Sequence, residues 1–414
     1  MSSIKKNIAY SSLLTVANYL FPLLTYPYVS RVLGVDNIGV CNFVDSVINY
    51  FMLASMLGIT TVGVREISRN KGNLNELNKT FSRIFSINTI TTTIALVLLG
   101  GAIFTVPQFR ENQQFMWIGA LKLVSNYLLV EWLYKGLEEF KYITTRTVGV
   151  KCLYVAAVFL FIKSPEDTAT YYMLLTLMVT ANAMINIIHS RKYVSLNFTI
   201  SETSPLLKSI VILGVYALLT SMYTTFNVVY LGFECGDTQV GYYTTSTKIY
   251  RIILAIFTAV TGVMMPRLSA LLAEGKKDEF KHLIGKSFKI LFALFIPGSI
   301  AIGILAPFII QIIAGPGYEG AVMPLRIISP LLLIIGIEQI IIIQGLLPLK
   351  KDRAVLINSA AGAAVGLIAN IVLVPKYGAA GAAVAWFAAE ITVLISASIF
   401  FIKAMKEIKS TENI

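Results

Sequence analysis

The chain consists of apolar runs, each roughly 20 residues long, separated by short polar stretches. An α-helix needs about 20 residues to cross the roughly 30 Å of hydrocarbon in a bilayer at about 1.5 Å per residue. Of the 414 residues, 56% are hydrophobic and 14% are charged, whereas a soluble domain carries about 25% charged residues. The sequence therefore predicts an all-α integral membrane protein.

We count twelve such runs, each long enough to be one transmembrane helix. They lie near residues 8–30, 38–62, 82–105, 115–134, 143–163, 168–188, 206–232, 240–265, 287–312, 321–346, 354–374 and 379–402. The N-terminal stretch MSSIKKNIAY has no small-residue cleavage site after a short apolar core. We therefore expect the first helix itself to serve as the targeting signal.

The distribution of lysine and arginine predicts the orientation in the membrane. With the N-terminus inside, inward segments hold 25 of the 34 basic residues and outward loops hold four. Because cytoplasmic loops are rich in lysine and arginine, we expect both termini in the cytoplasm. The net charge of +12 is spread over five inward loops and both tails, so the sequence gives no indication of a nucleic-acid-binding domain.

An internal repeat indicates two halves of the same architecture. A shift of 202 residues pairs Gly39 with Gly241. The stretches VLGVDNIGV and YLGFECGDTQVGY each run from Leu-Gly through an acidic turn to an apolar residue and glycine, with the second turn four residues longer. We predict two six-helix bundles related by a pseudo-two-fold axis along the membrane normal. The predicted parts are the N-terminal bundle 1–190, a cytoplasmic linker 191–205 and the C-terminal bundle 206–414.

Five basic residues fall inside the apolar runs. A cation at the centre of a transmembrane helix costs about 2.5–3.5 kcal/mol on insertion scales, so each needs a partner or a water-filled cavity. Lys248 and Arg251 are three residues apart and therefore share a helix face. The five residues are Lys122, Lys151, Lys248, Arg251 and Arg326.

Four acidic residues also fall inside or at the edges of these runs: Asp45, Glu131, Glu338 and Glu390. They admit two interpretations. Each is either a charge partner for one of the cations or a protonatable group that couples an ion gradient to transport. For Asp45 the first interpretation is favoured over the second.

The first run contains two prolines, Pro22 and Pro27, and is followed by Arg31. A proline inside a transmembrane helix frees a backbone carbonyl and kinks the helix. We expect this run to be a bent element that faces a cavity or moves. Arg31 is either an interfacial anchor or the outer station of an anion-binding site.

Several stretches resemble one known family. They are PLLTYPYVSRVLG near the N-terminus, WLYKGLEEFKYITTRTVGVKCLYV at 132–155, YEGAVMPLRIISP at 318–330 and PKYGAAGAAVAWFAAE at 375–390. In this order they resemble the bacterial polysaccharide-biosynthesis (Wzx-type) flippases of the multidrug/oligosaccharidyl-lipid/polysaccharide exporter superfamily. The resemblance covers nearly the whole chain.

The resemblance implies a central cavity between the two bundles and alternating access to the two sides of the bacterial inner membrane. It implies transfer of an undecaprenyl-diphosphate-linked oligosaccharide from the cytoplasmic to the outer leaflet for O-antigen or capsule assembly. Polysaccharide polymerase and chain-length machinery are the expected partners. Because clustered cations hold diphosphates well, we expect the substrate to be bound by Arg251, Lys248, Lys122, Lys151, Arg31 and Arg326.

Three other functions were weighed. A multidrug exporter of the same superfamily is the nearest alternative. We would expect the binding site of such an exporter, which takes lipophilic cations, to be acidic and aromatic. A membrane polymerase or ligase needs a large outward loop with catalytic groups, and the sequence predicts no such loop. A channel needs a filter-like repeated loop, which the sequence also does not contain. The sequence has only two histidines and three cysteines and no CxxC motif, so it does not predict a metal site. It also contains no nucleotide-binding motif, so we expect no cofactor.

Overall fold

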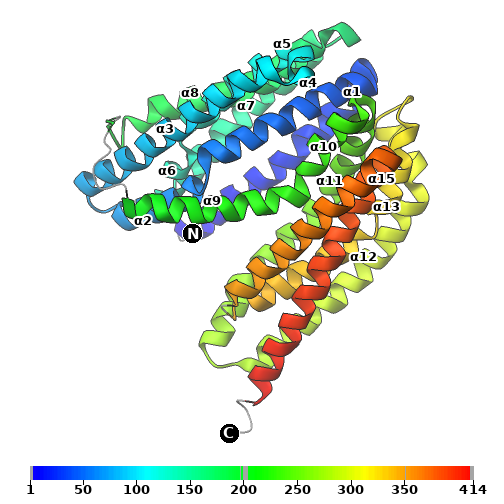
Figure 1. The fold of residues 1–414 in the computed structure, drawn as a ribbon. Coiled ribbons are helices and arrows are strands. Elements are labelled where there is room, and N and C mark those ends of the chain that lie inside the picture. The colour runs from blue at the N-terminus through cyan, green and yellow to red at the C-terminus, as the bar shows by residue number, and fades with distance from the viewer. Residues whose placement is uncertain (1–2, 196, 199–203, 350, 411–414) are drawn as a thin grey trace. The chain divides into compact units, whose positions relative to one another are not determined.

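The computed structural model describes residues 3–195, 197–198, 204–349 and 351–410. The described chain is helical, with no strand in these ranges (Figure 1). Its contacts divide it into two units, Met1–Leu218 and Leu219–Ile414. Of the predicted linker 191–205, residues 196 and 199–203 lie outside the described residues.

The N-terminal unit is built from long helices joined by short ones. Its elements are α1 (Ser3–Met56), α2 (Ile59–Asn70), α3 (Leu74–Thr105), α4 (Pro107–Glu111), α5 (Gln113–Leu128), α6 (Glu131–Gly136), α7 (Phe140–Phe161), the 3₁₀ turn η1 (Pro165–Asp167), α8 (Thr168–Ser190) and most of α9 (Ser204–Thr224). Contacts run from α5 to α8, α7, α1 and α3 and back to α5, so these helices form a closed bundle.

The C-terminal unit has the same kind of construction. Its elements are α10 (Phe226–Cys235), α11 (Asp237–Ala273), α12 (Lys277–Ile313), the 3₁₀ turn η2 (Glu319–Ala321), α13 (Val322–Ile328), α14 (Leu331–Glu338), the π-helix η3 (Gln339–Leu346) and α15 (Asp352–Ser410). Here α15 packs against α10, α13 and α14, while α11 packs against α10, α12 and α13.

Helix α9 packs with the N-terminal unit over most of its length. The Gly58 amide donates a hydrogen bond of 3.0 Å to the Ile210 carbonyl, and a Cβ at Gly214 would overlap the side chain of Leu57. The sequence places the start of the C-terminal bundle at residue 206, whereas the contacts divide the chain after Leu218. The boundary between the predicted membrane bundles therefore stays a prediction.

Seven helices among the described residues are long and apolar enough to span a membrane. Two of them contain 48 and 54 residues, over Ala9–Met56 and Arg353–Lys406. At about 1.5 Å per residue, each is more than twice as long as a bilayer's hydrocarbon is thick, so each can cross twice. The chain is a multi-pass membrane protein, and the number of twelve crossings remains a prediction.

Both of these long helices are broken at a glycine with positive φ. Gly34 interrupts α1 with φ 79° and ψ 171°, and Gly378 interrupts α15 with φ 52° and ψ −128°. Helix α1 continues through Pro22 and Pro27, so its departure from helical geometry comes at the glycine and not at the prolines. Only glycine adopts such backbone angles without strain.

The glycine break of α1 is repeated in the C-terminal unit. Gly236, between α10 and α11, has φ 79° and ψ −178°, and it lies 202 residues after Gly34. The stretches 34–39 and 236–241 therefore correspond residue for residue. The Leu-Gly pairs of the two stretches had instead aligned Gly34 with Gly232, with a four-residue insertion after it. The structure corrects this pairing, because Gly232 lies inside the helix α10.

A polar side chain three residues after Gly34 and another three residues after Gly236 each contact a distant turn or break of their own unit. Asn37 donates a hydrogen bond of 3.4 Å to the Pro165 carbonyl beside α8. Gln239 accepts a bond of 2.9 Å from the Ala379 amide at the break of α15. The internal repeat thus extends from the sequence to the same tertiary contact in both units.

We predict that alanine at either break destabilises the protein. Gly34→Ala and Gly236→Ala each place a Cβ in free space but force φ near 79° on a non-glycine residue, which costs about 1–3 kcal/mol. The apparent unfolding midpoint of the purified protein in detergent should fall in both variants. Gly101→Ala is the matched control, because Gly101 is an exposed residue in the interior of α3 and alanine favours a helix. Equal midpoints for all three variants would contradict the prediction.

Candidate functional site

The predicted site residues are divided between the two units. The N-terminal unit carries Arg31 and Asp45 on α1, Lys122 on α5, Glu131 on α6 and Lys151 on α7. The C-terminal unit carries Lys248 and Arg251 on α11, Arg326 on α13, Glu338 at the end of α14 and Glu390 on α15.

Lys122 forms an ion pair with Asp45 inside the N-terminal bundle. The Nζ of Lys122 donates to Oδ1 of Asp45, and the hydroxyl of Tyr172 reaches the same oxygen at 3.4 Å. The lysine and aspartate side chains are 14% and 31% exposed. Gly119, one turn before Lys122, brings α5 close to α1, because a Cβ there would overlap Ile48. The charge of Lys122 is therefore neutralised by a residue 77 positions away.

Lys151 is held by neutral groups. Its Nζ donates a hydrogen bond of 2.8 Å to Oδ1 of Asn18 and lies 5.8 Å from the ring centroid of Phe21. Among the described residues, no carboxylate forms an ion pair with Lys151. The amide oxygen and the ring face therefore position the ammonium group of Lys151, but they do not neutralise its charge.

Two further cations are exposed near helix ends and turns. The guanidinium of Arg31 donates a bond of 2.7 Å to the Pro27 carbonyl one turn earlier on α1. The Nε of Arg326 donates a bond of 3.3 Å to the Gly303 carbonyl of α12.

Lys248 and Arg251 lie in one continuous helix, α11, and share a face as their spacing predicts. Arg251 is exposed, and Lys248 is half-buried. The four residues before Lys248 are buried threonines and serine, and the hydroxyl of Ser246 donates a bond of 2.7 Å to the Ala321 carbonyl at η2. This contact holds α11 against η2, the turn that directly precedes α13 and its Arg326.

The acidic residues have different surroundings. Glu131 forms an ion pair of 3.8 Å with Lys135 on the same short helix. Glu338 and Glu390 are buried, 7% and 5% exposed, and they lie on α14 and α15, which pack against each other. The indole nitrogen of Trp386 donates a bond of 2.7 Å to Glu390.

Arg146 is a half-buried cation and is one of the 25 basic residues predicted to lie in inward segments. It lies in α7, where its guanidinium donates to the side chains of Asn186 and Thr147 and its Cζ lies 5.8 Å from the ring centroid of Tyr142. Its Nε has no hydrogen-bond partner among the described residues. The sequence signal for this contact is Asn186, a buried amide in the last turns of the apolar helix α8.

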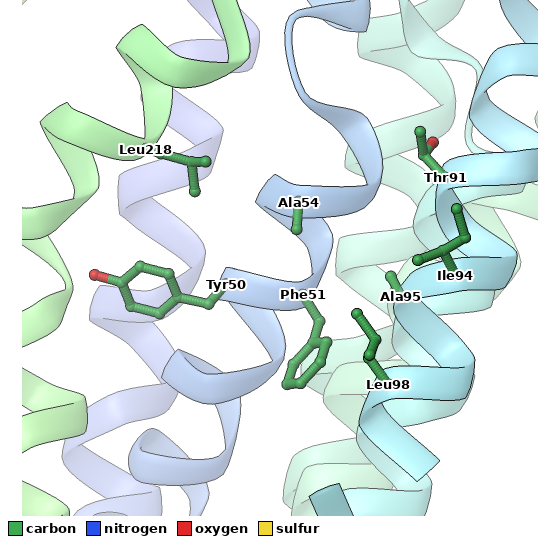
Figure 2. A pocket seen from close by; sticks show the side chains of 8 residues that line it. All are labelled: Tyr50, Phe51, Ala54, Thr91, Ile94, Ala95, Leu98 and Leu218. Carbon is green, nitrogen blue, oxygen red and sulfur yellow. The ribbon is translucent and has the colours of Figure 1, made fainter. Parts of the chain in front are cut away.

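An apolar cavity of about 370 Å³ lies in the N-terminal unit (Figure 2). It is lined by Tyr50, Phe51 and Ala54 of α1, by Thr91, Ile94, Ala95 and Leu98 of α3, and by Leu218 of α9. None of the predicted site residues lines it. Its chemistry suits hydrocarbon and not a charged head group.

Comparison with known sequences gives a consistent result. A profile for the family described as polysaccharide biosynthesis protein matches residues 4–272. A candidate O-antigen transporter of Escherichia coli K12 is 25% identical over 94% of this chain and 95% of its own length. A candidate O-antigen transporter of Shigella dysenteriae is 27% identical over 97% of this chain and its own entire length.

Comparison with solved structures identifies the fold. The lipid II flippase MurJ in an inward closed conformation superposes with a TM-score of 0.77 at 15% identity, over 97% of this chain and 90% of that one. An inward-facing multidrug resistance transporter of the MATE family superposes with a TM-score of 0.69 at 14% identity, over 97% of this chain and 96% of that one. The chain therefore has the fold shared by these transporters of the MOP superfamily.

We predict that the Asp45 and Lys122 side chains depend on each other for stability. Lys122→Met leaves the carboxylate without its cation, and Asp45→Asn leaves the ammonium without its anion, so each single variant should lower the unfolding midpoint in detergent. The double variant should be more stable than the sum of the two losses, by a coupling of about 1–3 kcal/mol. Strictly additive effects in this double-mutant cycle would contradict the pairing.

Proposed function

Because the chain belongs to the polysaccharide biosynthesis protein family, we propose that it is a flippase for undecaprenyl-diphosphate-linked oligosaccharide repeat units. It moves them from the cytoplasmic to the outer leaflet of the bacterial inner membrane by alternating access. The product serves the assembly of a surface polysaccharide such as O-antigen or capsule. In this proposal the protein is a transporter and performs no bond-forming or bond-breaking chemistry on its substrate.

The names of the relatives and the fold support this class of function. Two relatives that match over nearly their whole lengths are described as O-antigen transporters, and a structural neighbour is named as the flippase of a lipid. Likeness to the MATE transporter is a likeness of fold at 14% identity, so a multidrug exporter is the alternative that the functional test must separate.

The environment of Lys151 carries the proposal. An ammonium group in a transmembrane helix costs free energy, and Asn18 and Phe21 hold it without neutralising it. Such a cation attracts an anionic ligand, whereas a site for lipophilic cations requires the opposite charge. We therefore assign Lys151 to the diphosphate and give Lys122, which Asp45 neutralises, a smaller share in binding.

Lys248 and Arg251 complete the proposed set of phosphate ligands. An arginine contacts phosphate oxygens in a bidentate manner, and a neighbouring lysine adds a point charge. Arg31 and Arg326 are proposed as further residues that bind the anionic head group. Interaction with a polysaccharide polymerase and chain-length machinery is proposed from the family resemblance.

The function is tested by deleting the gene and following the lipid-linked oligosaccharides. Intact cells distinguish the two leaflets when a membrane-impermeant sugar-modifying reagent is applied from outside. We expect the oligosaccharide to accumulate on the cytoplasmic side and surface polysaccharide to disappear. Unchanged glycolipid together with new sensitivity to drugs would overturn the proposal in favour of a multidrug exporter.

We predict that Lys151→Gln lowers export in the complemented deletion strain by roughly tenfold to a hundredfold. The loss follows because a hydrogen bond to a charged group contributes about 1.5–3 kcal/mol, and about 1.4 kcal/mol corresponds to a factor of ten. Lys163→Gln is the matched control, since Lys163 is an exposed lysine just beyond the end of α7. Export at the control level with equal amounts of protein in the membrane would sink the assignment of Lys151.

We also predict that Arg251→Glu abolishes export while membrane insertion and protein abundance stay normal. The substituted carboxylate repels the diphosphate, whereas Arg251→Lys keeps the charge and loses only the bidentate geometry. The lysine variant should therefore retain partial export. Normal export by Arg251→Glu, measured as surface polysaccharide, would show that this arginine does not bind the anion.

A further inference from the structure

A polar pocket lies at the predicted cytoplasmic end of the N-terminal unit. It has a volume of about 530 Å³ and lies between the first turns of α3 and the segment that follows α8. Its lining residues are Leu74, Asn78, Arg191, Lys192, Tyr193, Val194 and Ser195. None of them is among the residues proposed above to bind the diphosphate, so the pocket is a separate candidate site.

Hydrogen bonds fasten the two sides of this pocket to each other. The Oδ1 of Asn78 accepts a bond of 2.8 Å from the Ser195 amide and one of 3.3 Å from the Ser195 hydroxyl. The Nδ2 of Asn78 donates a bond of 3.0 Å to the Leu74 carbonyl of the same helix. Val194 is buried and belongs to the apolar core of this end of the unit. The segment that carries the basic residues is therefore held against α3 by polar bonds and by core packing.

Two positive charges line the pocket. Arg191 and Lys192 are adjacent in the chain, and both are exposed. Among the described residues, no carboxylate forms an ion pair with either of them. Glu76, in the first turn of α3, is already paired with Lys79 at 2.8 Å. Glu139 acts electrostatically on the tyrosine that follows Lys192, so one nearby carboxylate faces two cations and the pocket keeps a net positive charge.

The pocket lies where two membrane-spanning segments end, and apolar side chains are exposed beside it. The segments are Pro165–Ser190, which ends just before the two cations, and Leu74–Thr105, which starts at the pocket. Ile188, one turn before Lys192, is 60% exposed, and Leu74 is 68% exposed. Cations next to exposed hydrocarbon at a membrane edge suit a ligand that has both an anionic group and an apolar chain.

We propose that this pocket binds the phosphate head group of an anionic membrane phospholipid, such as phosphatidylglycerol, in the leaflet on the predicted cytoplasmic side. The guanidinium of Arg191 contacts two phosphate oxygens, and the ammonium of Lys192 adds a point charge. Basic pockets between membrane helices on the cytoplasmic side bind anionic lipid head groups by the same chemistry. The bound lipid joins α3 to the segment after α8. This site does not depend on the proposed transport function.

The proposal is tested by lipid binding to the purified full-length protein in detergent. Phosphatidylglycerol or phosphatidylcholine is titrated, and the bound lipid is counted by native mass spectrometry. The wild type should bind phosphatidylglycerol at least tenfold more tightly. Arg191→Gln/Lys192→Gln should weaken this binding about thirtyfold, because each basic group beside an anionic head group contributes roughly a fivefold gain in affinity. Equal affinity of the wild type for the two lipids would overturn the proposal.

A matched control separates the pocket from general attraction to positive charge. Arg65→Gln/Arg69→Gln removes two exposed charges from α2, outside the pocket, and should change the affinity for phosphatidylglycerol less than twofold. Equal weakening in both double variants would contradict a specific site. Arg191→Lys keeps the charge and should weaken binding by less than the double glutamine variant. It keeps the proposal testable if that double variant fails to fold.

Inorganic phosphate and glycerol phosphate distinguish a membrane lipid from a soluble ligand. Neither compound has a hydrocarbon chain, so a tenfold molar excess of either should leave phosphatidylglycerol bound. Displacement of the lipid at that excess would show that the pocket takes a soluble phosphate compound, and the lipid assignment would fall. These measurements involve no transport. Their failure would leave the proposed flippase function standing, and failure of that function would leave the lipid site standing.

Discussion

Charge inside hydrocarbon is the constraint on which the rest of this structure depends. Each ionised side chain in a membrane-spanning helix raises the free energy of the folded protein unless a partner, a dipole or water compensates it. The chain uses three different solutions. Lys122 is matched by a carboxylate, Lys151 is oriented by an amide and an aromatic ring, and the buried Glu390 accepts a hydrogen bond from the indole of Trp386. Only the first solution supplies a counter-charge, because the partners of Lys151 and Glu390 are neutral groups.

The backbone supplies the frame that holds these groups in place. Two glycines 202 residues apart adopt the same extended conformation with positive φ, and a side-chain amide beside each one contacts a distant turn of its own unit. The glycine breaks determine where the following helical segment starts. They therefore also determine which residues of α1 and α11 face inward. Asp45 lies eleven residues after the first break, and Lys248 lies twelve after the second.

Much of this architecture is predictable from the sequence. Runs of apolar residues of bilayer length predict the helices, since hydrophobicity and length alone decide which segments span. The pattern also indicated the repeat, but it aligned Gly34 with Gly232, because the two Leu-Gly pairs look alike and only the backbone angles identify Gly236. The partners of the charged residues were beyond local reasoning. Asp45 and Lys122 are 77 positions apart, so their ion pair depends on how α5 packs against α1. The contact of Arg146 with Asn186 was beyond local reasoning for the same reason, since its amide partner belongs to another helix.

The wide turns of η3 have a geometric consequence for the residues that follow them. A π-turn holds one residue more than an α-turn, so conversion of one such turn to α-helix shifts the downstream register by one residue. In an α-helix that is a rotation of about 100° and a rise of about 1.5 Å. Gln344, whose buried Oε1 lacks a partner among the described residues, would then point to a different neighbour. Such a conversion would be a screw motion of the segment after Glu338 and would not require that segment to unfold.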